Sequence, residues 1–224
     1  MRMNIQKNTR RLGSIAVLAM SVLFIGNALA DDNSDDSSLL GFLAKHTYVG
    51  SSVGSMSSNA AKTYNDGSVS NTKLDKNSLT GKIYAGIKMT KYFSLELAAQ
   101  DLGKSTLKGD SNGTGTIYDA GAIKSTNKVY GQTTNVVGRY PVTDRLTLFG
   151  EAGVFFWHSN ELLADPVSAD KDNQQGASFN YGGGFEYDIG VKDFFVWRVE
   201  VQQFTFDENN YDATAGSTGL VYRY

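Results

Sequence analysis

The sequence contains no cysteine, only two prolines and only two histidines. Without cysteine, the chain cannot form disulfide bonds, thiolate metal sites or a cysteine nucleophile. The histidines, His46 and His158, are far apart in the chain. A metal centre needs several ligands in convergent positions, which this composition does not supply. We therefore expect no metal and no cofactor.

Long hydrophobic runs are missing after residue 30. No stretch there approaches the roughly 18 apolar residues of a membrane-spanning helix. A chain that crosses a membrane without such helices must form a closed β-barrel, because only helices and closed barrels pair every backbone polar group in lipid. The mean hydropathy of -0.29 is typical of a barrel with a polar lumen.

The chain also lacks an excess of basic residues. Residues 1–30 hold four of the 21 Lys and Arg and none of the 23 acids, so the remainder carries a net charge of about -6. Nucleic-acid binding depends on basic patches. We therefore expect no nucleic-acid partner.

Residues 1–30 have the pattern of a secretory signal peptide. Lys7, Arg10 and Arg11 precede an apolar stretch at 15–25, and Ala28-Leu29-Ala30 matches an A-x-A cleavage site. The alternative is a single membrane anchor, but an acidic run begins at once at Asp31. We expect secretion across the inner membrane with cleavage, followed by an acidic, flexible mature N-terminus over 31–45.

Period-2 alternation dominates the rest of the chain and predicts β-strands. Between Phe179 and Tyr187, aromatic residues occupy one face and polar residues or glycine the other. A soluble half-buried sheet would alternate too. A membrane barrel is favoured because the polar faces carry charges of both signs in mid-strand, aromatics lie near strand ends, and short turns alternate with long polar segments.

The alternation predicts an all-β fold over residues 46–224, an eight-stranded antiparallel up-and-down transmembrane β-barrel. The expected strands are 46–56, 79–89, 93–102, 129–140, 146–157, 177–188, 195–206 and 217–224. Tight periplasmic turns are expected at 90–92, 141–144 and 189–194. Long extracellular loops are expected at 57–78, 103–128, 158–176 and 207–216.

The last strand ends on an aromatic residue. Leu220, Tyr222 and Tyr224 alternate, which places them toward lipid and Val221 and Arg223 toward the lumen. This ending is similar to the C-terminal signal that the barrel-assembly machinery recognises in outer-membrane precursors.

Several short stretches, taken in order, resemble the eight-stranded transmembrane domain of the OmpA-like family. They are Gly86-Ile87-Lys88, Leu95-Glu96-Leu97, Tyr140-Pro141-Val142-Thr143-Asp144, Gly153, Trp157, Gly183-Gly184-Phe185-Glu186-Tyr187, Arg198-Val199-Glu200 and Val221-Tyr222-Arg223-Tyr224. The resemblance implies a Gram-negative outer-membrane location, contact with lipid and lipopolysaccharide, and a monomer. Many members continue into a peptidoglycan-binding domain, and this sequence ends at the barrel, so we expect a barrel-only member.

The resemblance also implies a salt-bridge network in the lumen. Its candidate residues are Glu96, Glu186 and Arg198, which Glu151, Glu200 and Arg139 can join. The interior of an eight-stranded barrel is just wide enough to be filled by side chains, and buried charges there must pair. The network is interpreted either as a permanent plug or as a switchable Glu96–Arg198 gate for slow ion leakage.

Three function classes follow. The first is a structural or surface-interaction role, of the adhesion or colonisation type, carried by outer loops that bind a host or phage surface. The second is a narrow gated pore for ions or small solutes. The third is an acyl hydrolase, suggested by His158-Ser159. Adjacent strand residues point to opposite faces, so these two cannot cooperate and we expect no enzyme.

A run of three glycines, Gly182-Gly183-Gly184, lacks the strand-to-helix context of a phosphate loop. In a strand it predicts a bend or a close approach of neighbouring backbone.

Overall fold

The computed structural model describes residues 46–58, 68–75, 77–115, 118–164, 169–190, 194–206 and 211–223. The predicted signal peptide, the acidic segment 31–45 and Tyr224 lie outside the described residues. The chain divides into two units, residues 1–46 and 47–224. The fold below is that of the second unit.

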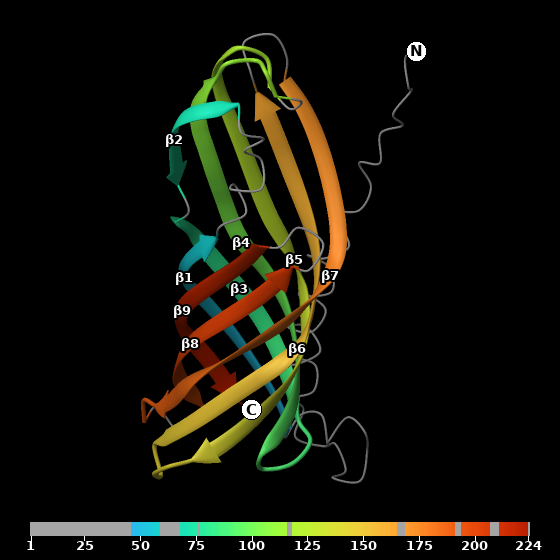
Figure 1. The fold of residues 1–224 in the computed structure, drawn as a ribbon. Helices are drawn as coiled ribbons and strands as arrows, with labels where there is room; N and C mark the ends of the chain where they lie inside the picture. The colour runs from blue at the N-terminus through green and yellow to red at the C-terminus, as the bar shows by residue number, and fades with distance from the viewer. Residues whose placement is uncertain are drawn as a thin grey trace. The chain divides into compact units, whose positions relative to one another are not determined.

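The described part of this unit consists of strands joined by turns (Figure 1). The strands are β1 Thr47–Ser58, β2 Val69–Asp75, β3 Asn77–Lys88, β4 Phe93–Ser111, β5 Gly121–Pro141, β6 Leu146–Ala164, β7 Ala169–Asp188, β8 Phe195–Phe206 and β9 Tyr211–Arg223. Within the described ranges, no helix is long and apolar enough to cross a membrane.

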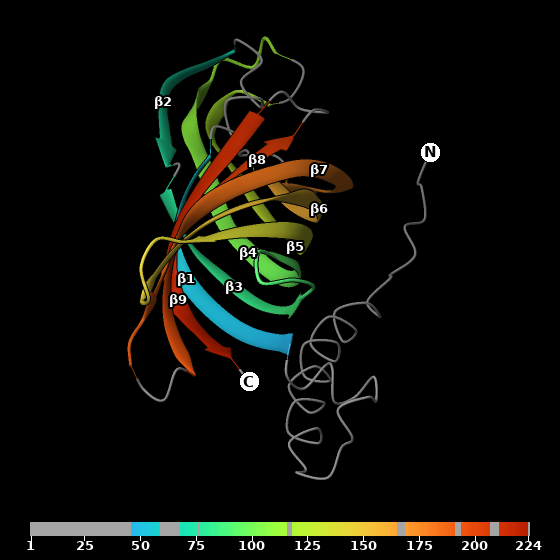
Figure 2. The ribbon, with the colours of Figure 1, turned by 90° about the horizontal axis from the view of Figure 1, so that it is seen from below.

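Eight of these strands form a closed antiparallel barrel. Going round the ring, β1 is followed by β3, β4, β5, β6, β7, β8 and β9, and β9 pairs with β1 again. Figure 2 shows the same strands from below, after a turn of 90° about the horizontal axis from the view of Figure 1. The predicted eight-stranded antiparallel barrel is confirmed, and β2 is an additional strand that pairs with β4.

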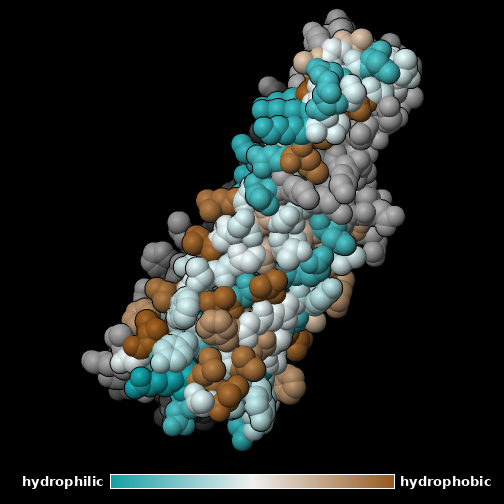
Figure 3. Space-filling model, turned by 60° about the vertical axis from the view of Figure 1, so that its left-hand side comes forward, coloured by the Kyte–Doolittle hydropathy of each residue, from teal (hydrophilic) through white to brown (hydrophobic). Residues whose placement is uncertain are grey.

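Side chains alternate between lumen and exterior along each strand. On β5, Asn135 and Val137 are buried, whereas Val136 between them is 56% exposed. The exterior of β5 carries tyrosines ten residues apart, Tyr130 and Tyr140. With a strand tilt of about 40°, ten residues rise about 25 Å, the height of the apolar band of an outer-membrane barrel. Figure 3 shows hydrophobic patches over the lower part of the barrel and mainly hydrophilic residues at the upper end.

Four strands are much longer than the apolar band requires. β4, β5, β6 and β7 have 19 to 21 residues, whereas β1, β3 and β8 have 12 and β9 has 13. The β4–β5 pairing continues, with one register shift, to Ser111↔Gly121, and the β6–β7 pairing continues without a shift to Ala164↔Ala169. We call β2 with residues 104–111, 121–129, 158–164 and 169–176 the outer sheet.

The outer sheet corrects the prediction of long loops. The expected loop 57–78 contains β2, the expected loops 103–128 and 158–176 are mostly paired hairpins, and β9 begins at 211 within the expected loop 207–216. Alternation is forced only where one face meets lipid. Beyond the membrane the outward face is polar and the inward face mixes polar with apolar residues. Burial still alternates there, but the hydropathy of the sequence does not alternate clearly with period 2. The tight turns predicted at 90–92 and 141–144 are present at 89–92 and 142–145. The third was expected at 189–194, between β7 and β8, and its residues 191–193 lie outside the described residues.

A β-bulge joins the barrel to the outer sheet. The β4–β5 register shifts between Asp101 and Gly103, and Gly103 has a φ of +77°, which glycine adopts without steric cost. The Asp101 carboxylate accepts a hydrogen bond from the Gly103 N–H at 2.8 Å, and Ser78 Oγ accepts one from the Lys104 N–H at 2.8 Å. Leu102 and Ser105 are both buried, so the bulge resets which positions face inward.

The predicted close approach at the triple glycine is present. A Cβ atom added at Gly184 would collide with the carbonyl oxygen of Val199 on the neighbouring β8. By contrast, a Cβ at Gly216 on β9 would meet nothing within 4 Å. The two glycines therefore form a matched pair for testing the contact between β7 and β8.

Gly184→Ala is expected to destabilise the barrel by about 1–3 kcal/mol, because β7 must move away from β8 to admit the methyl group. Urea unfolding in non-ionic micelles, followed by the heat-modifiable gel shift, measures the change. Gly216→Ala should stay within about 0.5 kcal/mol of wild type. Equal losses in the two variants would contradict the close approach.

Candidate functional site

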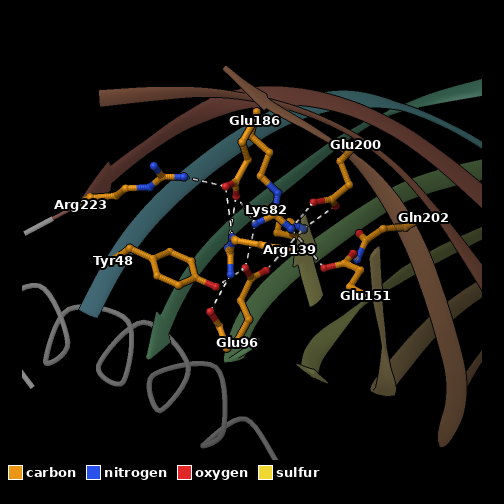
Figure 4. A network of polar contacts seen from close by, with 11 residues as sticks. Tyr48, Lys82, Glu96, Arg139, Glu151, Glu186, Glu200, Gln202 and Arg223 are labelled. Carbon is orange, nitrogen blue, oxygen red and sulfur yellow. Dashed lines mark hydrogen bonds and ion pairs between the residues drawn. The ribbon is translucent and has the colours of Figure 1, made fainter. Parts of the chain in front are cut away.

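The lumen contains a compact group of charged side chains near the end with the short turns (Figure 4). We call it the charged layer. Its members come from β3 to β9 and comprise four cations and four carboxylates: Lys82, Arg139, Arg198, Arg223, Glu96, Glu151, Glu186 and Glu200. Each lies at an inward-facing position of its strand, so strand alternation brings them together.

Arg198 is the centre of the charged layer and is 1% exposed. Its Nη1 lies 2.8 Å from Glu96 Oε2, and its Nη2 lies 2.7 Å from Glu200 Oε2 and 3.2 Å from Glu151 Oε2. The fourth carboxylate, Glu186, is 3.8 Å from Nη1. One guanidinium therefore pairs with all four carboxylates, which its fork of fixed donors makes possible.

Two aromatic rings lie against the same guanidinium. The Arg198 guanidinium carbon lies 4.1 Å from the ring centre of Phe149 and 4.9 Å from that of Tyr84. Such cation–π contacts are stronger when water is excluded. They also restrict the guanidinium to one orientation.

A second cluster lies on the side of the short turns. Arg139 makes two hydrogen bonds to Glu186, Nε to Oε2 at 3.1 Å and Nη2 to Oε1 at 3.2 Å. Its guanidinium carbon lies 4.8 Å from the ring centre of Tyr48. The Tyr48 hydroxyl donates to Glu96 Oε2 at 3.0 Å. Tyr48 and Glu186 thus link the two arginines into one network.

Lys82 completes the pairing on the opposite side. Its Nζ lies 2.5 Å from Glu200 Oε1 and 3.8 Å from Glu96 Oε1. Gln202 Nε2 donates to Glu151 Oε1. Charges removed from water are costly unless paired, and here the charges of the layer balance. Removal of one charged member would therefore leave its partners buried without a compensating charge.

An apolar layer fills the lumen between the charged layer and the outer sheet. Its aromatic members are Phe155, Trp157, Phe204 and Phe206, and the others are Met56, Leu102, Val129, Ala213 and Ala215. Phe155 and Phe204 pack edge to face at 5.0 Å, as do Trp157 and Phe206 at 5.5 Å. Trp157 Nε1 donates to Ser178 Oγ at 2.8 Å. Two groups of buried side chains, one charged and one apolar, thus lie inside the barrel.

All the lumen residues proposed from the sequence lie in the charged layer: Glu96, Glu151, Glu186, Arg198, Glu200 and Arg139. Sequence reasoning missed Lys82, Tyr48 and the apolar layer. The alternation could have identified them. Lys82 lies on the strand face opposite Ile83, and Phe204 and Phe206 occupy the same inward face as Gln202 on β8.

The terminal strand has the predicted orientation where it is described. Leu220 is 49% exposed and Val221 is 1% exposed. Arg223 Nη2 lies 2.7 Å from Glu186 Oε2, so this arginine reaches the lumen. Tyr224, the third residue of the predicted assembly signal, lies outside the described residues. Recognition of Leu220 and Tyr222 by the barrel-assembly machinery stays a prediction.

The candidate catalytic pair points in two directions. The exposed His158 ring stacks on Tyr130 with ring centres 5.9 Å apart. Ser159 is buried and donates to Asn127 Oδ1 at 2.6 Å. The described residues contain no cluster of three His, Asp or Glu arranged to hold a metal ion.

Comparisons with known proteins agree with this geometry. The family model of the OmpA-like transmembrane domain matches residues 43–224. Outer membrane protein P5 of Haemophilus influenzae is 24% identical over 173 residues, which are 70% of this chain and 46% of that protein. The chain thus spans about half the length of this curated relative.

Solved structures with the same fold include the outer membrane protein OprG from Pseudomonas aeruginosa and Neisserial surface protein A. The first has a TM-score of 0.52 at 11% identity, covering 80% of this chain and 96% of OprG. The second has a TM-score of 0.51 at 10% identity, covering 80% of this chain and 97% of the neisserial protein. At such identities the likeness concerns the fold.

Arg198→Met is expected to destabilise the barrel by about 3–5 kcal/mol, because it leaves buried carboxylates without their shared partner. Urea unfolding in non-ionic micelles measures the loss. Lys128→Met is the control, since Lys128 and Asp101 form a 3.0 Å pair with both side chains about half exposed. Its loss should be below about 1 kcal/mol. A loss for Arg198→Met as small as that of the control would show that the charged layer does not stabilise the barrel.

Proposed function

Because the chain belongs to the family of OmpA-like transmembrane domains and resides in the Gram-negative outer membrane, we propose that it acts as a surface-interaction protein. The barrel anchors the outer sheet at the cell surface. The outer sheet binds a partner outside the cell, in an adhesion or colonisation role.

The observation that carries this proposal is the contrast between the lumen, which is filled by side chains, and the strands that extend beyond the apolar band. The lumen is filled by the charged and apolar layers, whereas β4 to β7 continue beyond the apolar band as paired strands. A pore would need a hydrated path, and the buried side chains occupy that space. The exposed surface available for function is therefore on the outer sheet.

The proposal includes no catalytic role. His158 and Ser159 lie on opposite faces of β6, so a histidine base and a serine nucleophile are not within reach of each other. This arrangement supports a binding function over hydrolysis of lipid acyl chains.

Shortening one hairpin of the outer sheet tests the binding role. Ser159 and Gln174 are paired, so residues 160–173 can be replaced by Asn-Gly, which favours a two-residue hairpin turn. Bacteria that display this variant are expected to adhere to epithelial monolayers no better than bacteria without the protein. The control places Asn-Gly at Thr143-Asp144, in a short turn at the other end, and should adhere like wild type. Full adherence of the shortened variant would contradict the proposal.

Planar bilayer recording tests the alternative of a gated pore. With both layers in place, the wild-type protein is expected to show no stepwise channel openings. Defined openings that Arg198→Met alters in conductance or frequency would support the gate and overturn the interpretation of the lumen as a permanent plug.

A further inference from the structure

Among the described strands, β2 alone lies outside the closed ring, at the margin of the outer sheet (Figure 1). β3 pairs with β4 from Ser94 to Asp101, and β2 follows on the same side of β4 from Thr106 to Ser111. β2 has seven residues, and β4 is its only neighbour in the part of the sheet that the structure describes. This side of β4 is therefore an edge that accepts an added strand.

The pairing of β2 with β4 is irregular. Its register shifts between Ser70 and Lys73, so that Asn71 and Thr72 oppose the single residue Gly109. A bulge of this kind leaves one residue of the strand unpaired. Asn71 has a φ of +52°, a left-handed backbone that is less favourable than extended backbone for residues with a side chain. By contrast, the pairing of the same part of β4 with β5 contains no shift.

Like charges also face each other across β2 and β4. Lys73 is directly opposite Lys108, and Lys108 is directly opposite Lys124 on β5. Directly opposed side chains have Cβ atoms about 4.5–5.5 Å apart, and like charges at this spacing destabilise a strand pair. Neither Lys73 nor Lys108 forms a salt bridge with any described residue. A carboxylate at the position of Lys73 would turn this repulsion into attraction.

The inward face of β2 contributes apolar contacts. Leu74 is opposite the buried Leu107. Val69 lies against Gly109, since a Cβ atom added to that glycine would come within 2.7 Å of Val69 Cγ1. A strand that replaces β2 must therefore supply apolar side chains at the positions of Val69 and Leu74.

The outward face of β2 is held by exposed hydrogen bonds to Asp110. Ser70 Oγ donates to the Asp110 carbonyl oxygen at 3.2 Å, and Asn71 Nδ2 donates to the Asp110 carboxylate at 3.2 Å. Such bonds have a small net free energy, because water takes the place of either partner when they break. They give β2 little advantage over another extended segment.

We propose that β2 is an exchangeable strand, and that the edge of β4 at residues 106–111 binds an extended segment of a partner protein in its place. Strand addition uses main-chain hydrogen bonds for affinity and alternate side chains for specificity. The partner segment pairs without the bulge, and it places apolar residues opposite Leu107 and Ser111 and a carboxylate opposite Lys108. This inference rests on the proposed surface-interaction role and specifies how the outer sheet performs it.

A second copy of the chain is a poor occupant of this edge. Its β2 would bring the same bulge and the same Lys73 opposite Lys108, so the exchange would remove neither defect. Association would also cost the translational and rotational freedom of one chain. A segment of different sequence is therefore favoured.

Binding of two synthetic peptides to the full-length protein in dodecyl maltoside micelles tests the exchange. Both peptides have the sequence of residues 68–75 without Thr72, and the acidic peptide also contains Lys73→Glu. Fluorescence anisotropy should show the acidic peptide binding about tenfold more tightly than the peptide that keeps Lys73. In the protein variant Lys108→Gln, the two affinities should agree within about threefold, because the opposing charge is gone.

Because the chain has no cysteine, an engineered disulfide can hold β2 on β4 reversibly. Ser70→Cys with Asp110→Cys joins a directly opposed pair of the two strands. The oxidised variant should bind the acidic peptide at least about tenfold more weakly than the reduced one. The matched control, Asp110→Cys with Ala122→Cys, joins β4 to β5 and should bind equally in both states. The heat-modifiable gel shift verifies that each variant is folded.

Equal binding of the acidic peptide before and after reduction of the β2–β4 disulfide would overturn the proposal, because the peptide would then bind elsewhere. So would a peptide-free dimer that this disulfide abolishes, since the edge would then receive β2 of a second copy. Both disulfide variants retain the β6–β7 hairpin. Strand exchange can therefore fail here while the adhesion test of that hairpin succeeds, so the two failures are distinguishable.

Discussion

The ion pairs of Arg198 are the interaction on which the barrel interior depends. In lipid, a sheet must close on itself to satisfy its backbone, and eight strands close around a lumen only as wide as its side chains. That narrow space holds four carboxylates, all within reach of one guanidinium. The rings of Phe149 and Tyr84 lie against the guanidinium. Arg139, Lys82 and Arg223 then balance the remaining charge.

The buried side chains of the lumen support the proposal that function resides on the outer sheet. Above the charged layer, Phe155, Trp157, Phe204 and Phe206 fill the interior up to the level at which the shorter strands end. Four strands continue past that level, and the bulge at Gly103 resets the alternation of β4 as it leaves the barrel. The same sheet therefore forms the membrane barrel in its lower half and the exposed outer sheet, for which we propose a binding role, in its upper half.

The type of side chain on the exterior of this sheet changes from the short-turn end to the outer sheet. Along β5 it passes from Tyr140 through Val136 to Tyr130 and then to Lys128 and Lys124. Aromatic rings on β5 thus mark both edges of the apolar band, and two lysines of β5 follow beyond Tyr130. Lipid, interface and charged headgroup each select the side chains that face them.

The sequence by itself determined the barrel where lipid imposes alternation. Arg198 and Glu200 on one strand face with Trp197 and Val199 on the other, together with the tight turns, predicted the strands of the apolar band. The family resemblance predicted most of the charged layer. The outer sheet could not be predicted, because strands with two polar faces have no period. Which carboxylates meet Arg198, and that Lys73, Lys108 and Lys124 align, was decided only by tertiary structure. Register across three strands depends on the bulge and on ring closure, and neither leaves a local pattern in the sequence.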